Sequence, residues 1–99
     1  MTSQERDIVI QYSRQADKFV SNSNRKLSFN IVNGLCHKAV KRIFGNNINI
    51  DLKKLKSKKN QYRIRYRHFR IIFQYDLKKQ TIIVFIISVY NRDKSYKKR

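Results

Sequence analysis

The segment 61–76, QYRIRYRHFRIIFQYD, places arginines at a spacing that suits the binding of anionic groups. Successive side chains of a β-strand point to opposite faces, so Arg63 and Arg65 are predicted on one face and their apolar neighbours on the other. A tight turn at residues 67–68 would bring a second strand back, with Arg70 on the same face as the first two arginines. Arginines held on a rigid sheet present planar, paired N–H donors at fixed positions, which is the arrangement that a phosphate-rich polyanion requires.

The whole chain is extremely basic, with 24 Lys and Arg against 6 Asp and Glu in 99 residues, and a formal net charge of +18. Self-repulsion at this level destabilises a free compact domain. The hydrophobic content of 40% is too high for a disordered basic tail, so a folded core is expected. We therefore expect a polyanionic target, an acidic partner that neutralises the charge, or both.

The length predicts one domain spanning residues 1–99, with a polar N-terminal end at 1–6 and a basic tail at 91–99. Cys36 is the only cysteine, which argues against an intramolecular disulfide or a cysteine-based metal site. Its place in an apolar helical pattern favours a small core residue over a reactive thiol. The start of the chain does not resemble a signal peptide, and the longest apolar run, residues 82–89, is too short to span a bilayer. We expect a cytoplasmic protein that makes no membrane contact.

Two helices are predicted in the first half of the chain, after a short strand at residues 7–12. Ser13 is a suitable N-cap for the first helix, in which apolar residues follow helical spacing. The second helix is predicted over residues 25–43, with Ser23 or Asn24 as its N-cap.

The second half of the chain is predicted to form β-structure. Residues 48–55 are ambiguous, because their apolar positions fit both a strand and a helix. The segment 61–76 gives the first two strands of a meander, Lys78 and Lys79 form the next turn, and residues 82–90 give the third strand. This last strand is apolar on both faces, so we expect it in the middle of the sheet, covered on both sides. The order β-α-α-β-β-β predicts an α+β fold, in which an antiparallel meander packs against an N-terminal helical hairpin and the first strand joins the sheet.

A set of short motifs in this order resembles the RelE/ParE superfamily of bacterial toxins, and the resemblance covers about residues 7–97. The motifs are LKKL (52–55), YRIR (62–65), FRIIF (69–73), IISV (86–89) and RDKSY (92–96). Each is weak alone, whereas the ordered set at these spacings is fairly specific.

The resemblance implies a compact ribonuclease toxin of a toxin–antitoxin pair. The RelE branch enters the ribosomal A site and cuts the messenger RNA there without a metal ion or other cofactor: the 2′-hydroxyl attacks the adjacent phosphate and the 5′-oxygen leaves. The implied partners are a cognate antitoxin, with an acidic segment, and the ribosome with its RNA and the messenger RNA. Carried over by position, the catalytic residues are Arg63, Arg65, Arg70, Arg92 and Tyr96.

This chain departs from the best-known RelE branch, whose members tend to carry lysines at the positions of Arg63 and Arg65. Arginine stays protonated and is a poor general base. Tyr96 is then the better candidate base, if surrounding positive charge acidifies its phenol, and an exposed tail residue is the structural alternative. His68 also titrates near neutral pH, with an exposed turn residue as its alternative.

Further basic residues are expected to dock on ribosomal RNA through its phosphates, and such binding is salt dependent. The aromatic residues Tyr62, Tyr66 and Phe69 could stack on bases, although their alternation with arginines favours packing in the core. The expected docking residues are Lys53, Lys54, Lys56, Lys58, Lys59 and Arg67.

Two other functions compete with the nuclease. ParE-like members share the fold but poison DNA gyrase, and a third option is an RNA-binding protein without activity. The arginine set favours the nuclease branch, because gyrase poisons tend to lack the full set.

Overall fold

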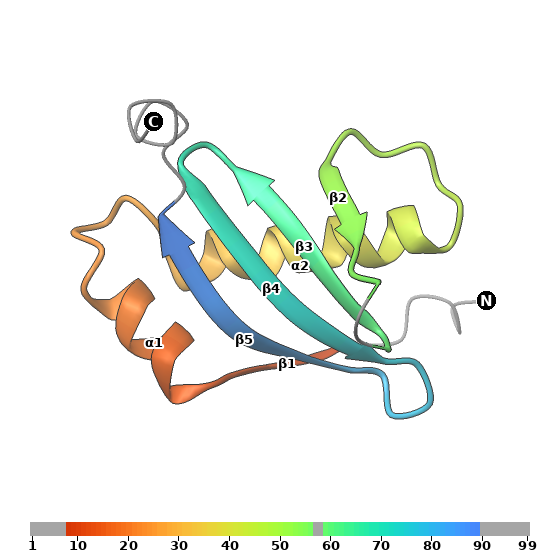
Figure 1. Ribbon diagram of the computed structural model, residues 1–99, viewed down its shortest axis with the longest axis horizontal. Helices are drawn as coiled ribbons and strands as arrows, with labels where there is room; N and C mark the ends of the chain where they lie inside the picture. The colour runs from red at the N-terminus through yellow and green to blue at the C-terminus, as the bar shows by residue number, and fades with distance from the viewer. Residues whose placement is uncertain (1–7, 57–58, 90–99) are drawn as a thin grey trace.

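The structure, a computed structural model, describes residues 8–56 and 59–89. These residues form a mixed sheet of five strands with two helices (Figure 1). The elements are, in chain order, β1 (Val9–Tyr12), α1 (Arg14–Ser21), α2 (Phe29–Ile43), β2 (Asp51–Lys54), β3 (Gln61–Tyr66), β4 (Phe69–Asp76) and β5 (Thr81–Val89). The predicted α+β fold is thereby confirmed. The predicted polar end, the basic tail, and the site residues Lys58, Arg92 and Tyr96 lie outside the described residues.

The strands are arranged in the order β1-β5-β4-β3-β2, and β3, β4 and β5 form the predicted antiparallel meander. β1 joins the sheet by pairing with β5 in parallel. The ambiguous segment resolves as an additional strand, because Asp51–Lys54 pair antiparallel with β3 and form the edge opposite β1. The sheet is therefore one strand wider than predicted.

The predicted alternation is confirmed on β3 and β4. On β4 the apolar series is buried, whereas the residues between are only half-buried. The turn is at residues 67–68, and Arg67 adopts a left-handed backbone with φ +56°. We call the buried side of the sheet the inner face and the side that carries the arginines the outer face. The buried inner-face residues of the meander are Ile64, Phe69, Ile71, Phe73, Tyr75, Ile82, Val84 and Ile87.

Both helices contribute to a single core with the inner face. α2 crosses behind the sheet and α1 lies beside β5 (Figure 1). Cys36 of α2 is fully buried, which confirms that it is a small core residue. In the described part of the chain, neither helix is long and apolar enough to cross a membrane.

The helix starts were predicted with mixed success. Ser13 caps α1 as predicted, since its hydroxyl accepts a hydrogen bond from the Ala16 N–H at 3.1 Å. The start of the second helix was wrong: α2 begins at Phe29, and Ser28 is its N-cap. Asn24 and Arg25 have φ of 60° and 69°, which a right-handed helix cannot contain.

The prediction that the last strand is covered on both sides was also wrong. β5 lies between β1 and β4 in the sheet, but Ile86, which is on its outer face, is 48% exposed. The reason is that both helices bury their apolar residues on the inner face, and none of the described elements covers the outer face.

The side chain of Gln15 extends the sheet beyond β1. β1 pairs with β5 only as far as Val84. Past that point the Gln15 amide donates to the Ile87 carbonyl at 2.9 Å and accepts from the Ile87 N–H at 3.0 Å. These two bonds replace the backbone of a strand and satisfy the open edge of β5.

Candidate anion-binding site

Three of the predicted catalytic arginines lie together on the outer face, and we call Arg63, Arg65 and Arg70 the arginine cluster. Arg65 on β3 is the direct cross-strand partner of Arg70 on β4, and Arg63 is two residues along the same strand. Side chains in direct cross-strand positions have Cβ atoms about 4.5–5.5 Å apart. Ile64 and Ile71, the inward-facing neighbours, are fully buried and hold both strands in register. The cluster is therefore built on rigid backbone.

The sequence analysis missed an acidic residue in this cluster, Asp51 of β2. Asp51 is the cross-strand partner of Arg65. Its carboxylate lies 3.3 Å from Nη2 of Arg63 and 3.8 Å from Nε of Arg65. A signal was present, because a strand reading of the ambiguous segment places Asp51 on the face opposite Leu52.

Two rows of side chains run across the outer face. One row is polar and consists of Asp51, Arg65, Arg70 and Ser88. The adjacent row starts with two basic residues and ends with two apolar ones, namely Lys53, Arg63, Ile72 and Ile86. The arrangement can hold an anion on the first row and the apolar part of a ligand on the second.

The electrostatics of the cluster favour an anionic ligand. Like charges in direct cross-strand positions destabilise a sheet, and Arg65 and Arg70 occupy such positions. An oxyanion between two guanidinium groups removes that repulsion and accepts several charge-assisted hydrogen bonds. Positive charge placed in this way also stabilises negative charge that develops on a reacting phosphate.

The buried titratable groups do not serve as bases at this site. Tyr12, Cys36 and Tyr75 belong to the core side of the molecule, and desolvation by burial is the largest cause that raises the pKa of each. The pKa of the Cys36 thiol is raised to about 12. All three therefore remain protonated at neutral pH. Of the titrating candidates from the sequence, His68 is an exposed turn residue, and Tyr96 lies outside the described residues.

The predicted docking residues that the structure describes lie in two parts of the surface. The lysines of β2 and the segment after it are exposed near the start of β3, whereas Arg67 is exposed at the turn that follows its other end. Lys53 is the direct cross-strand partner of Arg63 and lies beside the arginine cluster, whereas Arg67 lies past the cluster at the other end of β3. The exposed lysines are Lys53, Lys54, Lys56 and Lys59. The aromatic residues pack as predicted: Phe69 is buried, and Tyr62 and Tyr66 are half-buried against the core.

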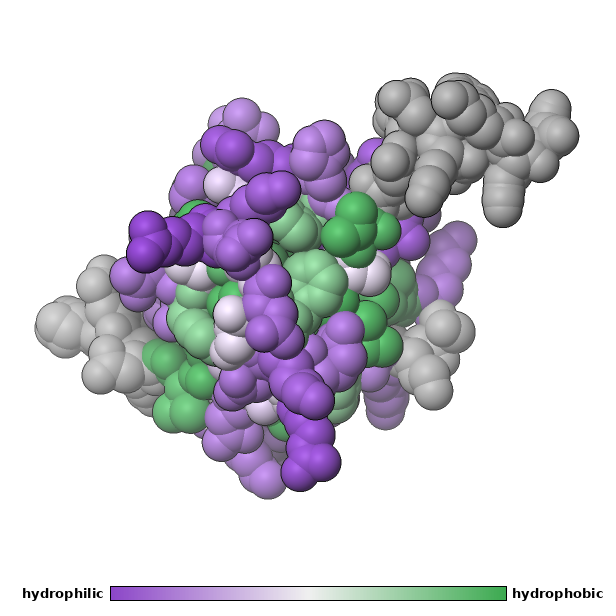
Figure 2. Space-filling view, turned by 90° about the vertical axis from the view of Figure 1, so that its left-hand side faces the viewer, coloured by the Kyte–Doolittle hydropathy of each residue, from purple (hydrophilic) through white to green (hydrophobic). Residues whose placement is uncertain are grey.

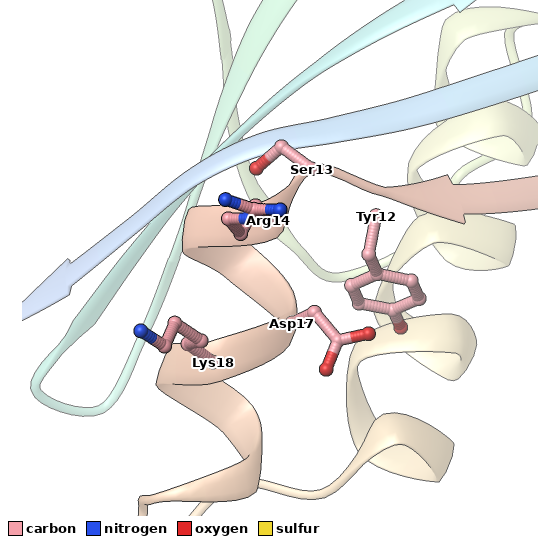
Figure 3. Close-up of a pocket in the computed structure, with 5 residues that line it drawn as sticks. All are labelled: Tyr12, Ser13, Arg14, Asp17 and Lys18. Carbon is pink, nitrogen blue, oxygen red and sulfur yellow. The ribbon is translucent and has the colours of Figure 1, made fainter.

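Hydrophilic side chains also cover most of the end of the molecule that holds α1, with small apolar areas between them (Figure 2). A shallow pocket lies there, lined by Tyr12, Ser13, Arg14, Asp17 and Lys18 (Figure 3). Asp17 points towards the Tyr12 hydroxyl, which donates to Asn33 at 2.6 Å. The pocket belongs to β1 and α1, at the opposite edge of the sheet from β2, so it is not part of the arginine cluster.

Within the described parts of the chain, His, Cys, Asp and Glu side chains do not gather in groups of three or more that could hold a metal ion.

Comparison with solved structures identifies the fold. The isolated Escherichia coli RelE toxin is 21% identical and matches over 93% of this chain and 94% of its own, with a TM-score of 0.57. The RelE–RelB complex from Pyrococcus horikoshii is 18% identical over 86% of this chain and 97% of that one, with a TM-score of 0.59. The YoeB–YefM complex from Staphylococcus aureus is 18% identical over 87% of this chain and 100% of that one, with a TM-score of 0.54. The chain thus has the fold of RelE toxins. It matches no protein-family model and no curated protein.

Proposed function

We propose that this chain, which has the RelE fold, is the toxin of a toxin–antitoxin pair and cleaves messenger RNA in the ribosomal A site. The observation that carries the proposal is the cross-strand pair of Arg65 and Arg70, with Arg63 beside it on the same open face. A purely structural role does not account for three arginines packed together on the outer face of a sheet, since their mutual repulsion costs stability.

In the proposed reaction the arginine cluster binds the scissile phosphate. Arg65 and Arg70 hold its non-bridging oxygens, and Arg63 adds positive charge beside them. The 2′-oxygen attacks the phosphorus while the bond to the 5′-oxygen breaks, and the leaving 5′-oxygen takes a proton from water. The products are a 2′,3′-cyclic phosphate and a 5′-hydroxyl. The arginines stabilise the charge that builds on the phosphate during this displacement.

Proton transfer needs groups other than the arginine cluster, because a guanidinium does not give up its proton at neutral pH. We assign the removal of the 2′-hydroxyl proton to Tyr96, and additional positive charge to Arg92, on the strength of the motif resemblance alone. The ribosome would supply the remaining geometry by holding the messenger RNA in a reactive conformation. The reaction so described uses no metal ion and no cofactor.

The proposed partners follow from the charge. The exposed lysines and Arg67 flank the arginine cluster and would contact ribosomal RNA in the cytoplasm. A cognate antitoxin with an acidic segment would neutralise part of the net charge of +18 and cover the arginine cluster or a sheet edge.

Translation of a defined messenger RNA with the purified protein tests the proposal. Primer extension should show cuts at codons in the reading frame, and these cuts should disappear when ribosomes are left out. Inhibition of DNA supercoiling by gyrase without RNA cleavage would instead identify a ParE-like gyrase poison. Binding of RNA without either effect would identify a non-catalytic RNA-binding protein.

A further inference from the structure

Asp51 is an acidic residue in a place where the proposed function calls for positive charge. Only 6 of the 99 residues are acidic. Two ion pairs form among residues 8–56 and 59–89. Both are made by Asp51, one with Arg63 and one with Arg65 of the arginine cluster. The cluster with Asp51 carries three positive charges and one negative charge, which leaves a local net charge of +2.

The ion pairs of Asp51 are weak enough for a bound anion to replace them. The distances of 3.3 Å and 3.8 Å are longer than the roughly 2.7–2.9 Å of a strong charge-assisted hydrogen bond. The Asp51 side chain is 56% exposed, whereas those of Arg63 and Arg65 are 15% and 30% exposed. The carboxylate can therefore turn into water while the two guanidinium groups stay in place. An ion pair whose carboxylate is exposed to water is screened and loses part of its Coulomb energy, so a stronger anionic ligand can displace it.

A phosphate held by Arg65 and Arg70, with Arg63 beside it, would share two of its three arginines with Asp51. The carboxylate lies 3.3 Å from Nη2 of Arg63 and 3.8 Å from Nε of Arg65, and a phosphate oxygen placed there would meet its negative charge. Binding of the anion against Arg63 and Arg65 therefore competes with the carboxylate.

We propose that Asp51 is an internal competitor for RNA phosphate: it occupies Arg63 and Arg65 in the free protein and is displaced when RNA binds. This inference rests on the proposed function only for the identity of the anion. Its consequence is that removal of the Asp51 charge strengthens RNA binding, which is the opposite of what removal of a ligand-contacting residue does.

The test compares Asp51→Asn with the wild type in RNA binding. Asparagine keeps the size of the side chain and a hydrogen-bond acceptor but removes the charge. The probe is a short single-stranded RNA with 2′-O-methyl groups, which cannot be cleaved, and the readout is fluorescence anisotropy across a range of salt concentrations. We expect Asp51→Asn to bind about 3- to 10-fold more tightly at low salt, and its salt dependence to steepen by roughly 0.7 in log–log slope, as for one more phosphate contact on a single strand.

Asp17→Asn is the matched control, because it changes the net charge equally and lies on α1 away from the arginine cluster. At 0.1 M salt we expect it to stay within about twofold of the wild type, since screening weakens charge effects beyond roughly 10 Å at that ionic strength, and the two variants are compared there. Circular dichroism should show the same fold in all three proteins.

The outcomes separate the two proposals. Tighter binding by Asp51→Asn than by Asp17→Asn supports the inference, even if the protein fails to cleave RNA on ribosomes and the proposed function is abandoned. Binding by Asp51→Asn that is equal to or weaker than that of Asp17→Asn overturns the inference. Asp51 would then be a residue that positions the arginines. This result leaves the proposed function standing. Absence of RNA binding by every variant also overturns it.

Discussion

Arg65 and Arg70 are direct partners across the hairpin of β3 and β4, so two like charges are fixed in neighbouring positions on the open face of the sheet. This relationship follows from the two-residue turn at 67–68, which pairs Tyr66 with Phe69 and therefore the next residues outward with each other. Because these two charges repel each other, an anion bound between them would stabilise the folded protein.

Inorganic phosphate should raise the melting temperature of the wild type, because it binds the folded state and relieves the repulsion in the arginine cluster. At ten times the dissociation constant the stabilisation is roughly 1.4 kcal/mol for one site. Arg65→Gln should reduce this effect strongly, and Arg14→Gln, an equal charge change on α1, should leave it nearly intact. Differential scanning fluorimetry at constant ionic strength measures both, and an equal shift in the two variants would argue against a phosphate site at the cluster.

Arg70→Ala should leave the fold intact and reduce ribosome-dependent cleavage by roughly 10²–10³, the loss typical of removing one preorganised donor to a transition state. Ribosome binding should fall much less, since the lysines and the other arginines still contact phosphate. Single-turnover cleavage beside ribosome co-sedimentation measures the two effects separately. A variant that binds poorly but cuts normally once saturated would make Arg70 a docking residue.

The alternation of residues in segment 61–76 was enough to predict the strands, the turn and the position of Arg70 beside Arg63 and Arg65. These features are local, because a period of two and a tight turn together determine the register of a hairpin. Asp51 was missed because its place depends on the pairing of β2 with β3 across a connection of six residues, and local propensity does not specify such a pairing.

The start of α2 and the exposure of β5 could not be predicted for a similar reason. Leu27 is 1% exposed, and the Ser23 hydroxyl bonds to its backbone N–H and carbonyl. Leu27 is thus buried after a left-handed turn at residues 24–25. Helical periodicity alone predicted that a helix would run through this turn. An apolar strand likewise indicates a buried position but not which face a helix covers.

Gln15→Ala should destabilise the protein by about 1–3 kcal/mol, because it leaves the Ile87 N–H and carbonyl without their partner in a partly buried position. Gln11→Ala is the control, as that side chain is exposed on β1. Equilibrium unfolding in urea compares the two. Equal stability of both variants would show that water satisfies the β5 edge as well as Gln15 does.

Stability should fall as the pH rises above 9, and Cys36 should cause part of the loss. Burial raises the pKa of its thiol from 9.0 to about 12 in the folded state, so between these values the unfolded chain loses a proton that the folded chain keeps. Release of that proton favours unfolding, and the stability present below pH 9 is lost progressively up to about pH 12. Urea unfolding at pH 8 and pH 10 measures the difference.

Cys36→Ala isolates this contribution from the other titrating groups. The variant should be less stable at pH 8, because a cavity replaces the sulfur, yet its stability should decrease less between pH 8 and pH 10. The same decrease in both proteins would contradict the assigned role of the thiol.

The arginine cluster should cleave messenger RNA only when the ribosome presents it. The most direct measurement is single-turnover cleavage of one messenger RNA, end-labelled and bound to ribosomes with an empty A site, beside the same RNA free in solution. We expect a single cut at the A-site codon on ribosomes, with a 2′,3′-cyclic phosphate on the upstream fragment, and little or no cleavage of the free RNA. Cleavage at equal rates with and without ribosomes, or an intact RNA in both, would contradict it.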